Sequence, residues 1–279
     1  MSQLNCLNLC EIIDYLYEQM PDFEAIVSKV SELAGFDRCE RIYVGSYFCG
    51  QYFLHQSRER IEALSVFCKK DDIPITLVIP TFSQKDLVRG KEKIAMMLEW
   101  LKGLVDEVVV NDYGMLVYIQ GKFDSSLYLG RLFAKDYRDP RYEAYFNQVL
   151  EPKIINRYML EIIKTFQVKG IEFDPTHIGI NFKEVPKELI VGVHTPYCYM
   201  TTGHICEYAS LEKEISKKFR PNSSCKHECS SYRIHYDFKD GRQWVRIGRT
   251  IYFENREFTL YEIENLRMIY FPIDMEVER

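Results

Sequence analysis

Short apolar runs alternate with longer amphipathic stretches along most of this chain. The run Ile75–Phe82 has the apolar character expected of a strand that is buried on both faces of a sheet. In the stretch that follows, Ile94, Met97, Leu98 and Leu101 recur at helical spacing. Because parallel strands need long crossover connections, a repeated strand and helix predicts a parallel sheet covered by helices.

The same alternation predicts an α/β fold built on a TIM-like barrel of strands and helices. We expect helices over residues 9–20, 23–33, 56–69, 94–105 and 154–166. We expect strands over residues 41–48, 75–82, 107–112, 126–133, 170–174, 189–194 and 266–273, the fourth being the weakest candidate. These six or seven strands are fewer than the eight of a full barrel, so an incomplete barrel stays open.

The carboxyl-terminal part of the chain has a different pattern. Residues 232–238 alternate polar and apolar side chains, a turn signal with Asp240-Gly241 follows, and the pattern resumes in residues 243–253. We therefore expect an antiparallel hairpin over residues 232–256, added to the barrel. No repeat, low-complexity tract or linker is evident, so residues 1–279 are predicted to form a single domain, with a loop at 138–141.

Composition and charge restrict the functional classes. The net charge of −5 gives no reason to expect a whole-surface affinity for nucleic acid or anionic membranes. No secretory signal and no run of 18 apolar residues is visible, so we expect a cytoplasmic protein without a membrane span. Thiols stay reduced in that compartment, and nine cysteines cannot all be paired, so clustered cysteines indicate metal binding or catalysis.

Four of the nine cysteines lie in the segment 194–229, which is expected to be a Cys-rich loop. Seven residues separate Cys198 from Cys206, eighteen separate Cys206 from Cys225, and three separate Cys225 from Cys229. The last gap fits a zinc ligand pair, whereas the uneven set fits an iron–sulfur cluster better. The spacing leaves iron–sulfur, zinc and ordinary buried cysteines open.

The segments VHTPYCYMTTGHICEYAS and NSSCKHEC resemble the cysteine signature of the collagenase-like peptidase family, the thirty-second family of unassigned, U-type peptidases. VVVNDYGML (108–116) and LYLGRLFAKDYRDPR are more weakly similar to the same family. The gap between Cys198 and Cys206 is one residue longer than the common form, and Ser230 replaces a frequent Arg. The positions that match the signature are His194, Cys198, Thr202, Gly203, Cys206, Asn222, Cys225 and Cys229.

The resemblance implies a TIM-like barrel that carries a 4Fe-4S cluster on Cys198, Cys206, Cys225 and Cys229. It also implies an oxygen-independent hydroxylase, since several members modify RNA bases or the ubiquinone ring. Two alternatives remain. One is a non-catalytic subunit, with a structural cluster or zinc, that forms a heterodimer with a related family member. The other is a peptidase, as the family name says, although the sequence has neither H-E-x-x-H nor G-x-S-x-G.

Other polar residues near predicted strand ends are candidates for function. His194, His204 and His227 are expected either beside the metal site or as hydrogen-bonded loop residues. Glu207 follows Cys206 and is a candidate acid or base. Four further residues follow predicted strands, and each either belongs to a functional loop or has a capping role: Asn111, Asp112, Gly114 and Asp174.

A local excess of positive charge marks the region around the predicted hairpin. Residues 211–256 hold 11 Lys and Arg against six Asp and Glu. Trp244 and Tyr252 are the aromatic residues there that could stack on RNA bases. The alternative is an ordinary solvated surface. The arginines on or near the hairpin are Arg233, Arg242, Arg246 and Arg249.

Overall fold

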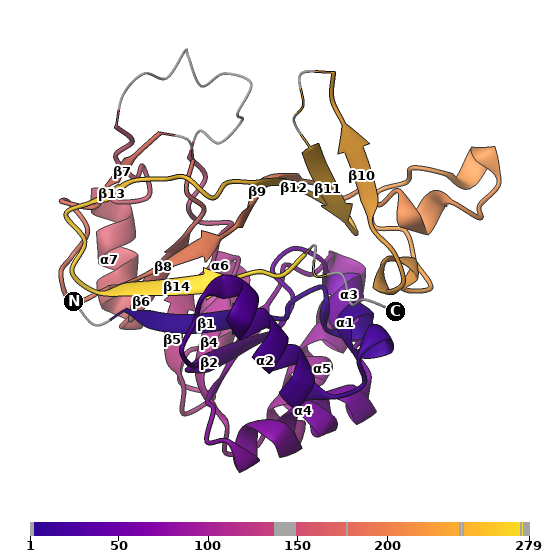
Figure 1. Cartoon of the computed structure of the whole chain (residues 1–279), viewed down its shortest axis with the longest axis horizontal. Coiled ribbons are helices and arrows are strands. Elements are labelled where there is room, and N and C mark those ends of the chain that lie inside the picture. Colours follow the sequence, from indigo (N-terminus) through magenta and orange to yellow (C-terminus); the bar gives the residue numbers. More distant parts are fainter. Residues whose placement is uncertain are drawn as a thin grey trace.

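Eight parallel strands close into a barrel in the computed structural model, which describes residues 3–136, 149–176, 178–239, 241, 243–273 and 275 (Figure 1). The order around the barrel is β1-β14-β8-β6-β5-β4-β3-β2. The strands are β1 (Leu4–Asn8), β2 (Arg41–Gly45), β3 (Ile75–Ile79), β4 (Val105–Val110), β5 (Ser126–Leu129), β6 (Gly170–Phe173), β8 (Ile190–Thr195) and β14 (Leu266–Tyr270). All seven predicted strands, including the weakest candidate, are therefore barrel strands.

The barrel is complete, so the open possibility of an incomplete barrel is excluded, and the six or seven predicted strands fall short of the eight observed. The missing member is β1, whose sequence LNCLN has two asparagines and no β-branched residue. Cys6 and Leu7 are nevertheless buried in the core. β1 joins the ring by pairing with β2 on one side and with β14 on the other. The residues of β1 have weak strand propensity, and their pairing with two neighbouring strands outweighs it.

Helices connect the strands and cover the outside of the barrel. Their bounds are α1 (Ile13–Gln19), α2 (Phe23–Ala34), α3 (Gly50–His55), α4 (Arg58–Lys70), α5 (Leu87–Trp100), α6 (Tyr113–Ile119) and α7 (Arg157–Phe166). Helices α2, α4 and α5 lie side by side in Figure 1. Asp22 caps the start of α2, and Gly35 ends it in the left-handed conformation. Within the described ranges, no helix combines the length and apolarity that crossing a bilayer requires.

A four-stranded antiparallel sheet lies beside the carboxyl ends of the barrel strands (Figure 1). Its order is β10 (Ile234–Asp237), β11 (Gln243–Ile247), β12 (Thr250–Glu254) and β9 (Tyr197–Thr202). The predicted antiparallel pairing is confirmed between β10 and β11. The chain then turns at Gly248, where φ is 54°, so the region expected to be one strand forms two. Two short strands, β7 (Ile180–Asn181) and β13 (Leu260–Tyr261), form a separate pair.

Some sequence predictions concern residues outside the described ranges. The loop predicted at 138–141 is one of them. Asp240 of the predicted turn and Arg242 of the predicted basic set are two others.

An ion pair fills the interior at the amino end of the barrel. Arg267 on β14 donates to both carboxylate oxygens of Glu107 on β4, at 2.7 and 2.9 Å. The side chains are only 4% and 8% exposed, respectively. Burial by itself would raise the pKa of Glu107, but the bonds and charge of Arg267 outweigh it and lower that pKa. Tyr128 also donates to Glu107, at 2.8 Å, so this end of the barrel is tightly cross-linked.

Replacing Glu107 by Gln should strongly destabilise the protein. Arg267 would keep its buried charge without a counter-charge, and such a loss costs about 3–5 kcal/mol. The matched control is Glu264→Gln, which breaks the exposed pair with Lys187 and should change little. Urea unfolding of both variants measures the difference. Equal effects of the two substitutions would show that the interior pair does not hold the barrel.

Candidate thiol and acid–base sites at the carboxyl end of the barrel

Four cysteines from separate parts of the chain line one hollow beside the carboxyl ends of the barrel strands. We call this the thiol hollow, and its space is about 580 Å³ with the open solvent at its rim included. Cys49 immediately precedes α3, after β2. Cys206 follows β9, and Cys229 lies in the short 3₁₀ helix Glu228–Ser230. Cys225 completes the set.

These thiols influence one another electrostatically. Burial raises the pKa of Cys225 to about 11, and the charges of Cys49 and Cys206 add to the effect. The pKa of Cys229 lies well above its usual range, because of burial first and then because of the other three thiols. Mutual repulsion among thiolates is the condition that a bound cation relieves. As they stand, no three His, Cys, Asp or Glu side chains of the described ranges form a site for a single metal ion.

Three of the four predicted ligands line the thiol hollow, and Cys198 is not among them. Cys198 lies on β9, buried with Trp244 and Phe253 in a separate apolar cluster. The next residue, Tyr199, points to the opposite face and packs its ring against Phe48, with centroids 4.8 Å apart. Because successive side chains of a strand alternate between faces, Cys198 points away from the barrel. The structure thus brings Cys49 to the group in which Cys198 was expected.

A buried carboxylate positions the loop that carries Cys49. Oε1 of Glu11 accepts from the Ser46 hydroxyl at 2.6 Å and from the amides of Tyr47 and Phe48 at 2.7 and 2.9 Å. The Ser46 hydroxyl in turn accepts from the amide of Cys49 at 2.9 Å. The sequence signal for Cys49 was its place just after a predicted strand, since barrel loops there carry function.

The other candidates near the cysteines fall into two groups. His204 and His227 line the thiol hollow, and Nε2 of His227 lies 3.6 Å from Oδ2 of Asp14. Glu207 does not line it. Instead, Glu207 pairs with Arg246 at 3.2 Å, which is the structural role rather than that of a free acid or base.

The candidate residues at the ends of the predicted strands have two different kinds of role. Asp112 caps α6, since its side chain accepts from the amide of Met115 at 2.8 Å. Asn111 donates to the carbonyl of Ile79 at 3.1 Å. Both residues therefore have local structural roles. Asp174, in contrast, forms an ion pair in the barrel interior.

The predicted RNA-stacking surface is absent from the described part of the hairpin. Trp244 is 7% exposed and Tyr252 is fully buried, so neither ring is free to stack on a base. Arg249 donates to the carbonyl of Phe48, and Arg233 stacks on Tyr15, 4.0 Å from the ring centre. These arginines therefore hold elements together.

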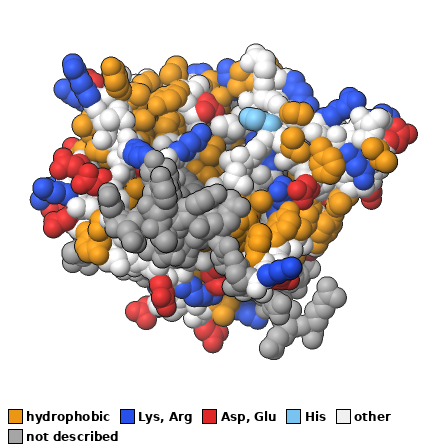
Figure 2. Space-filling view, turned by 90° about the horizontal axis from the view of Figure 1, so that it is seen from above, with side chains coloured by type: hydrophobic (Ala, Val, Ile, Leu, Met, Phe, Trp, Pro, Cys, Tyr) orange, Lys and Arg blue, Asp and Glu red, His pale blue; other side chains and the backbone are white. Residues whose placement is uncertain are grey.

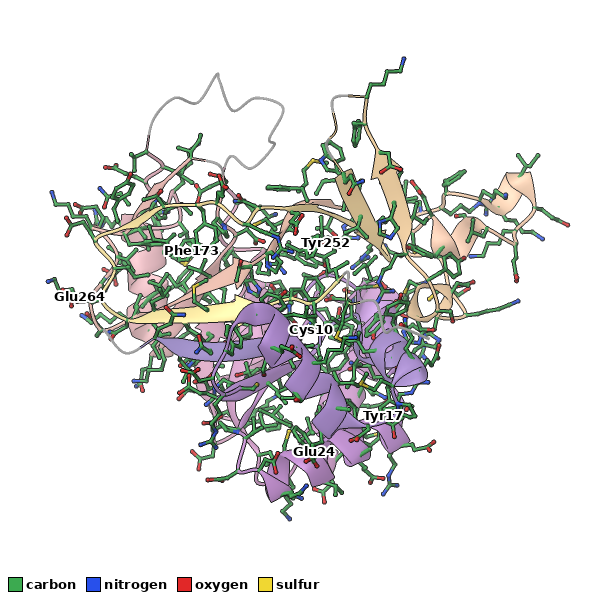
Figure 3. All side chains as sticks on the ribbon, viewed as in Figure 1. Cys10, Tyr17, Glu24, Phe173, Tyr252 and Glu264 are labelled. Atoms are coloured by element: carbon green, nitrogen blue, oxygen red, sulfur yellow. The ribbon has the colours of Figure 1, made fainter. Side chains whose placement is uncertain are left out.

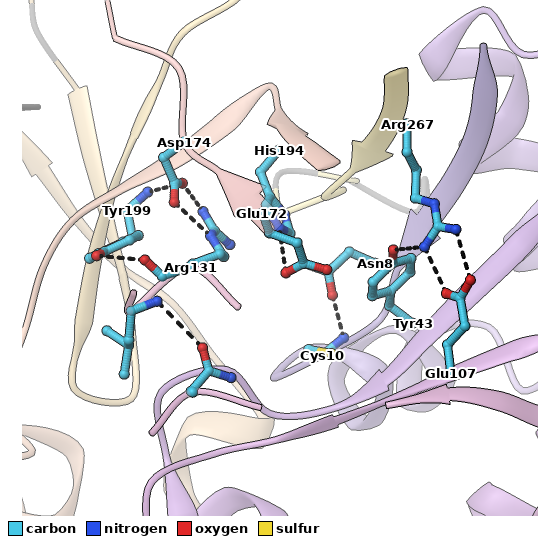
Figure 4. Close-up of polar contacts among 12 residues, drawn as sticks. Asn8, Cys10, Tyr43, Glu107, Arg131, Glu172, Asp174, His194, Tyr199 and Arg267 are labelled. Carbon is cyan, nitrogen blue, oxygen red and sulfur yellow. Dashed lines mark hydrogen bonds and ion pairs between the residues drawn. The ribbon is translucent and has the colours of Figure 1, made fainter. Parts of the chain in front are cut away.

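A second group, which we call the inner polar cluster, lies inside the carboxyl end of the barrel (Figure 4). It consists of Tyr47, Arg131, Glu172, Asp174 and His194. Arg131 forms a two-bond ion pair with Asp174, one bond being 2.9 Å from Nε. Nε2 of His194 lies 3.3 Å from Oε2 of Glu172. The ring of Tyr47 contacts the ring of His194, with centroids 5.1 Å apart, and lies 5.4 Å from the Arg131 guanidinium.

Burial makes the Glu172–His194 pair neutral near pH 7. It raises the pKa of the Glu172 carboxyl to about 8. Burial, helped by the positive charge of Arg131, lowers the pKa of His194 well below its usual range. A protonated carboxyl beside a neutral imidazole is suited to exchange a proton with a third group. His194 was expected either beside the metal site or as a hydrogen-bonded loop residue, but it lies on β8 and belongs to this cluster. Glu172 was not predicted at all.

No family model, no curated protein and no solved structure matches this chain.

Replacing Glu172 by Gln should change how stability depends on pH. A carboxyl whose pKa is raised by folding contributes stability that is complete below the unfolded value of 4.5 and is lost as the pH rises through about 8. Gln cannot titrate, so the free energy of unfolding of the variant minus that of the native protein should increase from pH 5 to pH 8. Other ionisable groups that act on Glu172, and stay in both proteins, are Tyr47, Arg131, Arg267 and Glu107.

Urea titrations of both proteins at each pH provide the measurement. A difference that stays constant from pH 5 to pH 8 would mean that Glu172 is ionised throughout this range.

Proposed function

We propose that this protein is an iron–sulfur enzyme that modifies an aromatic ring, by oxygen-independent hydroxylation or a related reaction. The proposed cluster ligands are Cys49, Cys206, Cys225 and Cys229. The observation that supports the proposal most is that four thiols, Cys49 from the loop after β2 and three from residues 206–229, line one hollow at the carboxyl end of a parallel barrel. Parallel barrels place their active sites at this end, and four cysteines are the usual ligand set of a 4Fe-4S cluster.

The chain's own residues fit such a group in chemistry. Cys229 is buried and the other three thiols are half-buried. The pKa values of Cys206, Cys225 and Cys229 are raised by burial and by neighbouring thiols, which a cationic iron centre would reverse. A bound cluster would supply one-electron transfer to and from an external partner. Arg249 lines the hollow and holds the Phe48 carbonyl through its guanidinium, which fixes the backbone beside Cys49.

The inner polar cluster would serve the proton side of the same reaction. Exchanging a ring hydrogen for a water-derived hydroxyl releases two electrons and two protons. The Glu172 carboxyl is protonated near pH 7, so it can donate a proton or a hydrogen bond to an oxygen of the substrate, and its burial excludes bulk water. The lowered pKa of His194 disfavours its protonation, so the two released protons would pass, like the electrons, to an external acceptor. Tyr47 and Cys49 belong to one loop and are separated by the single residue Phe48, so the inner polar cluster and the thiols are joined through a short piece of backbone.

A second candidate function is that of a subunit in a heterodimer with a related protein. The arm that carries Cys206 and Cys225 exposes several apolar side chains, with Ile215 91% and Phe219 56% exposed. Figure 2 shows hydrophobic side chains beside Lys and Arg over this end of the molecule. Exposed apolar groups of this kind are typical of interaction surfaces. A purified chain that is monomeric and active alone would exclude this function.

Removing Cys49 should abolish the cluster, whereas removing Cys198 should not. After purification without oxygen, the native protein should contain about four irons per chain. Cys49→Ala should lower the iron content to below about one per chain, because one of the four iron ligands is lost. Cys198→Ala should retain it, as should the control Cys68→Ala, whose thiol is buried on α4. Iron, sulfide and zinc analysis and the visible absorption provide the measurement.

Three results would contradict the proposal. A colourless protein with one zinc per chain would make the thiols a structural clip. Loss of iron in Cys198→Ala with retention in Cys49→Ala would return the ligand set to that expected from the sequence. Cleavage of a peptide substrate by the iron-free protein would favour a peptidase.

A further inference from the structure

The outer part of the arm that carries Cys206 and Cys225 stands clear of the rest of the molecule. We call its residues 211–220, with the sequence LEKEISKKFR, the arm tip. In Figures 1 and 3 this segment projects beyond the antiparallel sheet, away from the barrel, and its side chains extend into solvent. Its three large apolar side chains are 49%, 91% and 56% exposed, in the order Leu211, Ile215 and Phe219. Ile215 is the most exposed large apolar side chain among the residues that the structure describes.

The backbone holds Phe219 in its exposed position. The φ of Phe219 is 54°, in the left-handed region that bulky residues rarely adopt. Its amide donates to the Ser210 hydroxyl at 3.0 Å, and that hydroxyl donates to the carbonyl of Cys206 at 3.1 Å. Ser210 is buried, so these bonds tie the turn to the base of the arm. A strained residue that a bonded turn presents to solvent indicates a function for its side chain.

Positive charge surrounds these apolar side chains. Lys217 pairs with Glu214 at 3.1 Å within the tip, and Glu212 pairs with Lys226 at 3.2 Å beyond it, so both carboxylates of the tip are used. The whole chain has a net charge of −5, so an anionic partner would be attracted to this part of the molecule and not to its surface at large. The cations of the tip that pair with no carboxylate of the described ranges are Lys213, Lys218 and Arg220.

Apolar side chains among unpaired cations fit the surface of an anionic bilayer. The apolar groups can enter the boundary between headgroups and acyl chains, while the cations attract the headgroups. A specific protein interface takes up about 20–30 residues on each side, more than a projecting tip of this size offers by itself. A nucleic-acid strand would use the cations and a stacking ring, but it would leave the aliphatic side chains of Leu211 and Ile215 in water.

We propose that the arm tip docks this protein on an anionic lipid bilayer. Ile215 and Phe219 insert at the level of the headgroups, and the three unpaired cations lie among the lipid phosphates. The inference goes beyond the proposed function and does not depend on it, because docking requires no metal. It also gives the exposed side chains of the arm an occupant other than a partner subunit. Because Asn222, two residues after the tip, lines the thiol hollow, docking would bring the hollow close to the lipid surface.

Sedimentation of the full-length protein with unilamellar vesicles, over a range of lipid concentrations, tests the proposal. Vesicles of phosphatidylcholine with about one-third phosphatidylglycerol should bind the protein, and added salt should weaken the binding. Ile215→Ser should weaken it by about tenfold, because an apolar side chain no longer enters the bilayer. Lys218→Gln should weaken it by about fivefold, the effect of one cation near an anionic surface.

The matched controls make the same kinds of change elsewhere on the surface. Val66→Ser removes an apolar side chain that is 71% exposed on α4, and Lys187→Gln removes a cation that pairs with Glu264. Both variants should bind vesicles as the native protein does. Phe219→Asn separates docking from folding, because asparagine adopts the left-handed region more readily than phenylalanine. This variant should bind about tenfold more weakly without losing stability in urea.

Four results would overturn the inference. Equal binding to pure phosphatidylcholine vesicles would remove the role of charge, and no binding to anionic vesicles at millimolar lipid would exclude docking. A dimer of the lipid-free protein that Ile215→Ser dissociates, seen by ultracentrifugation, would make a second copy of the chain the occupant. Binding of a single-stranded RNA that Lys218→Gln weakens, without binding of vesicles, would make nucleic acid the partner. None of these results changes the iron content by which the proposed function is tested.

Discussion

Three hydrogen bonds to one carboxylate oxygen hold together two loops at the carboxyl end of the barrel. Oε1 of Glu11 accepts from the Ser46 hydroxyl and from the amides of Tyr47 and Phe48. The side chains that follow point to different places: the rings of Tyr47 and Phe48 flank Arg131, whereas Cys49 lines the thiol hollow. A buried carboxylate is costly unless it is bonded in this way. The bonds to Glu11 therefore fix, at once, a wall of the inner polar cluster and one thiol of the hollow.

The two ends of the barrel use buried polar groups differently. At the amino end, both oxygens of Glu107 are bonded to Arg267, and Tyr128 adds a further bond. Both ends keep a buried atom without a partner, Nε of Arg267 at the amino end and Nη1 of Arg131 at the carboxyl end. The difference lies in charge. The pKa of Glu107 is lowered by Arg267, which favours an ionised pair, whereas burial raises the pKa of Glu172 to about 8 and leaves a neutral carboxyl beside His194.

The sequence predicted the parts of the fold that local patterns determine. The apolar run that became β3 and the helical repeat of α2 needed no tertiary information, and the return of the chain in β14 followed from its apolar pattern. β1 was missed because its asparagines hide its strand character, although Asn8 is fully buried in the barrel. Glu172 was missed for a related reason. A carboxylate inside a short apolar strand gives no signal until the strand is placed facing a histidine.

The candidate thiol site shows where spacing along a chain stops being informative. Cys206, Cys225 and Cys229 come from loops and short 3₁₀ turns, which can converge without regard to strand period. Cys198 lies within β9, where the alternation of side chains lets only one of two neighbours face the barrel. Tyr199 takes that position, because its ring packs on Phe48 and its hydroxyl donates to the carbonyl of Arg131 at 3.2 Å. The hollow thus receives its fourth thiol from the loop after β2, more than 150 residues earlier in the chain. A cysteine inside a strand is therefore a metal ligand only if the strand's own packing turns it toward the site, and in this protein the packing of Tyr199 turns Cys198 away.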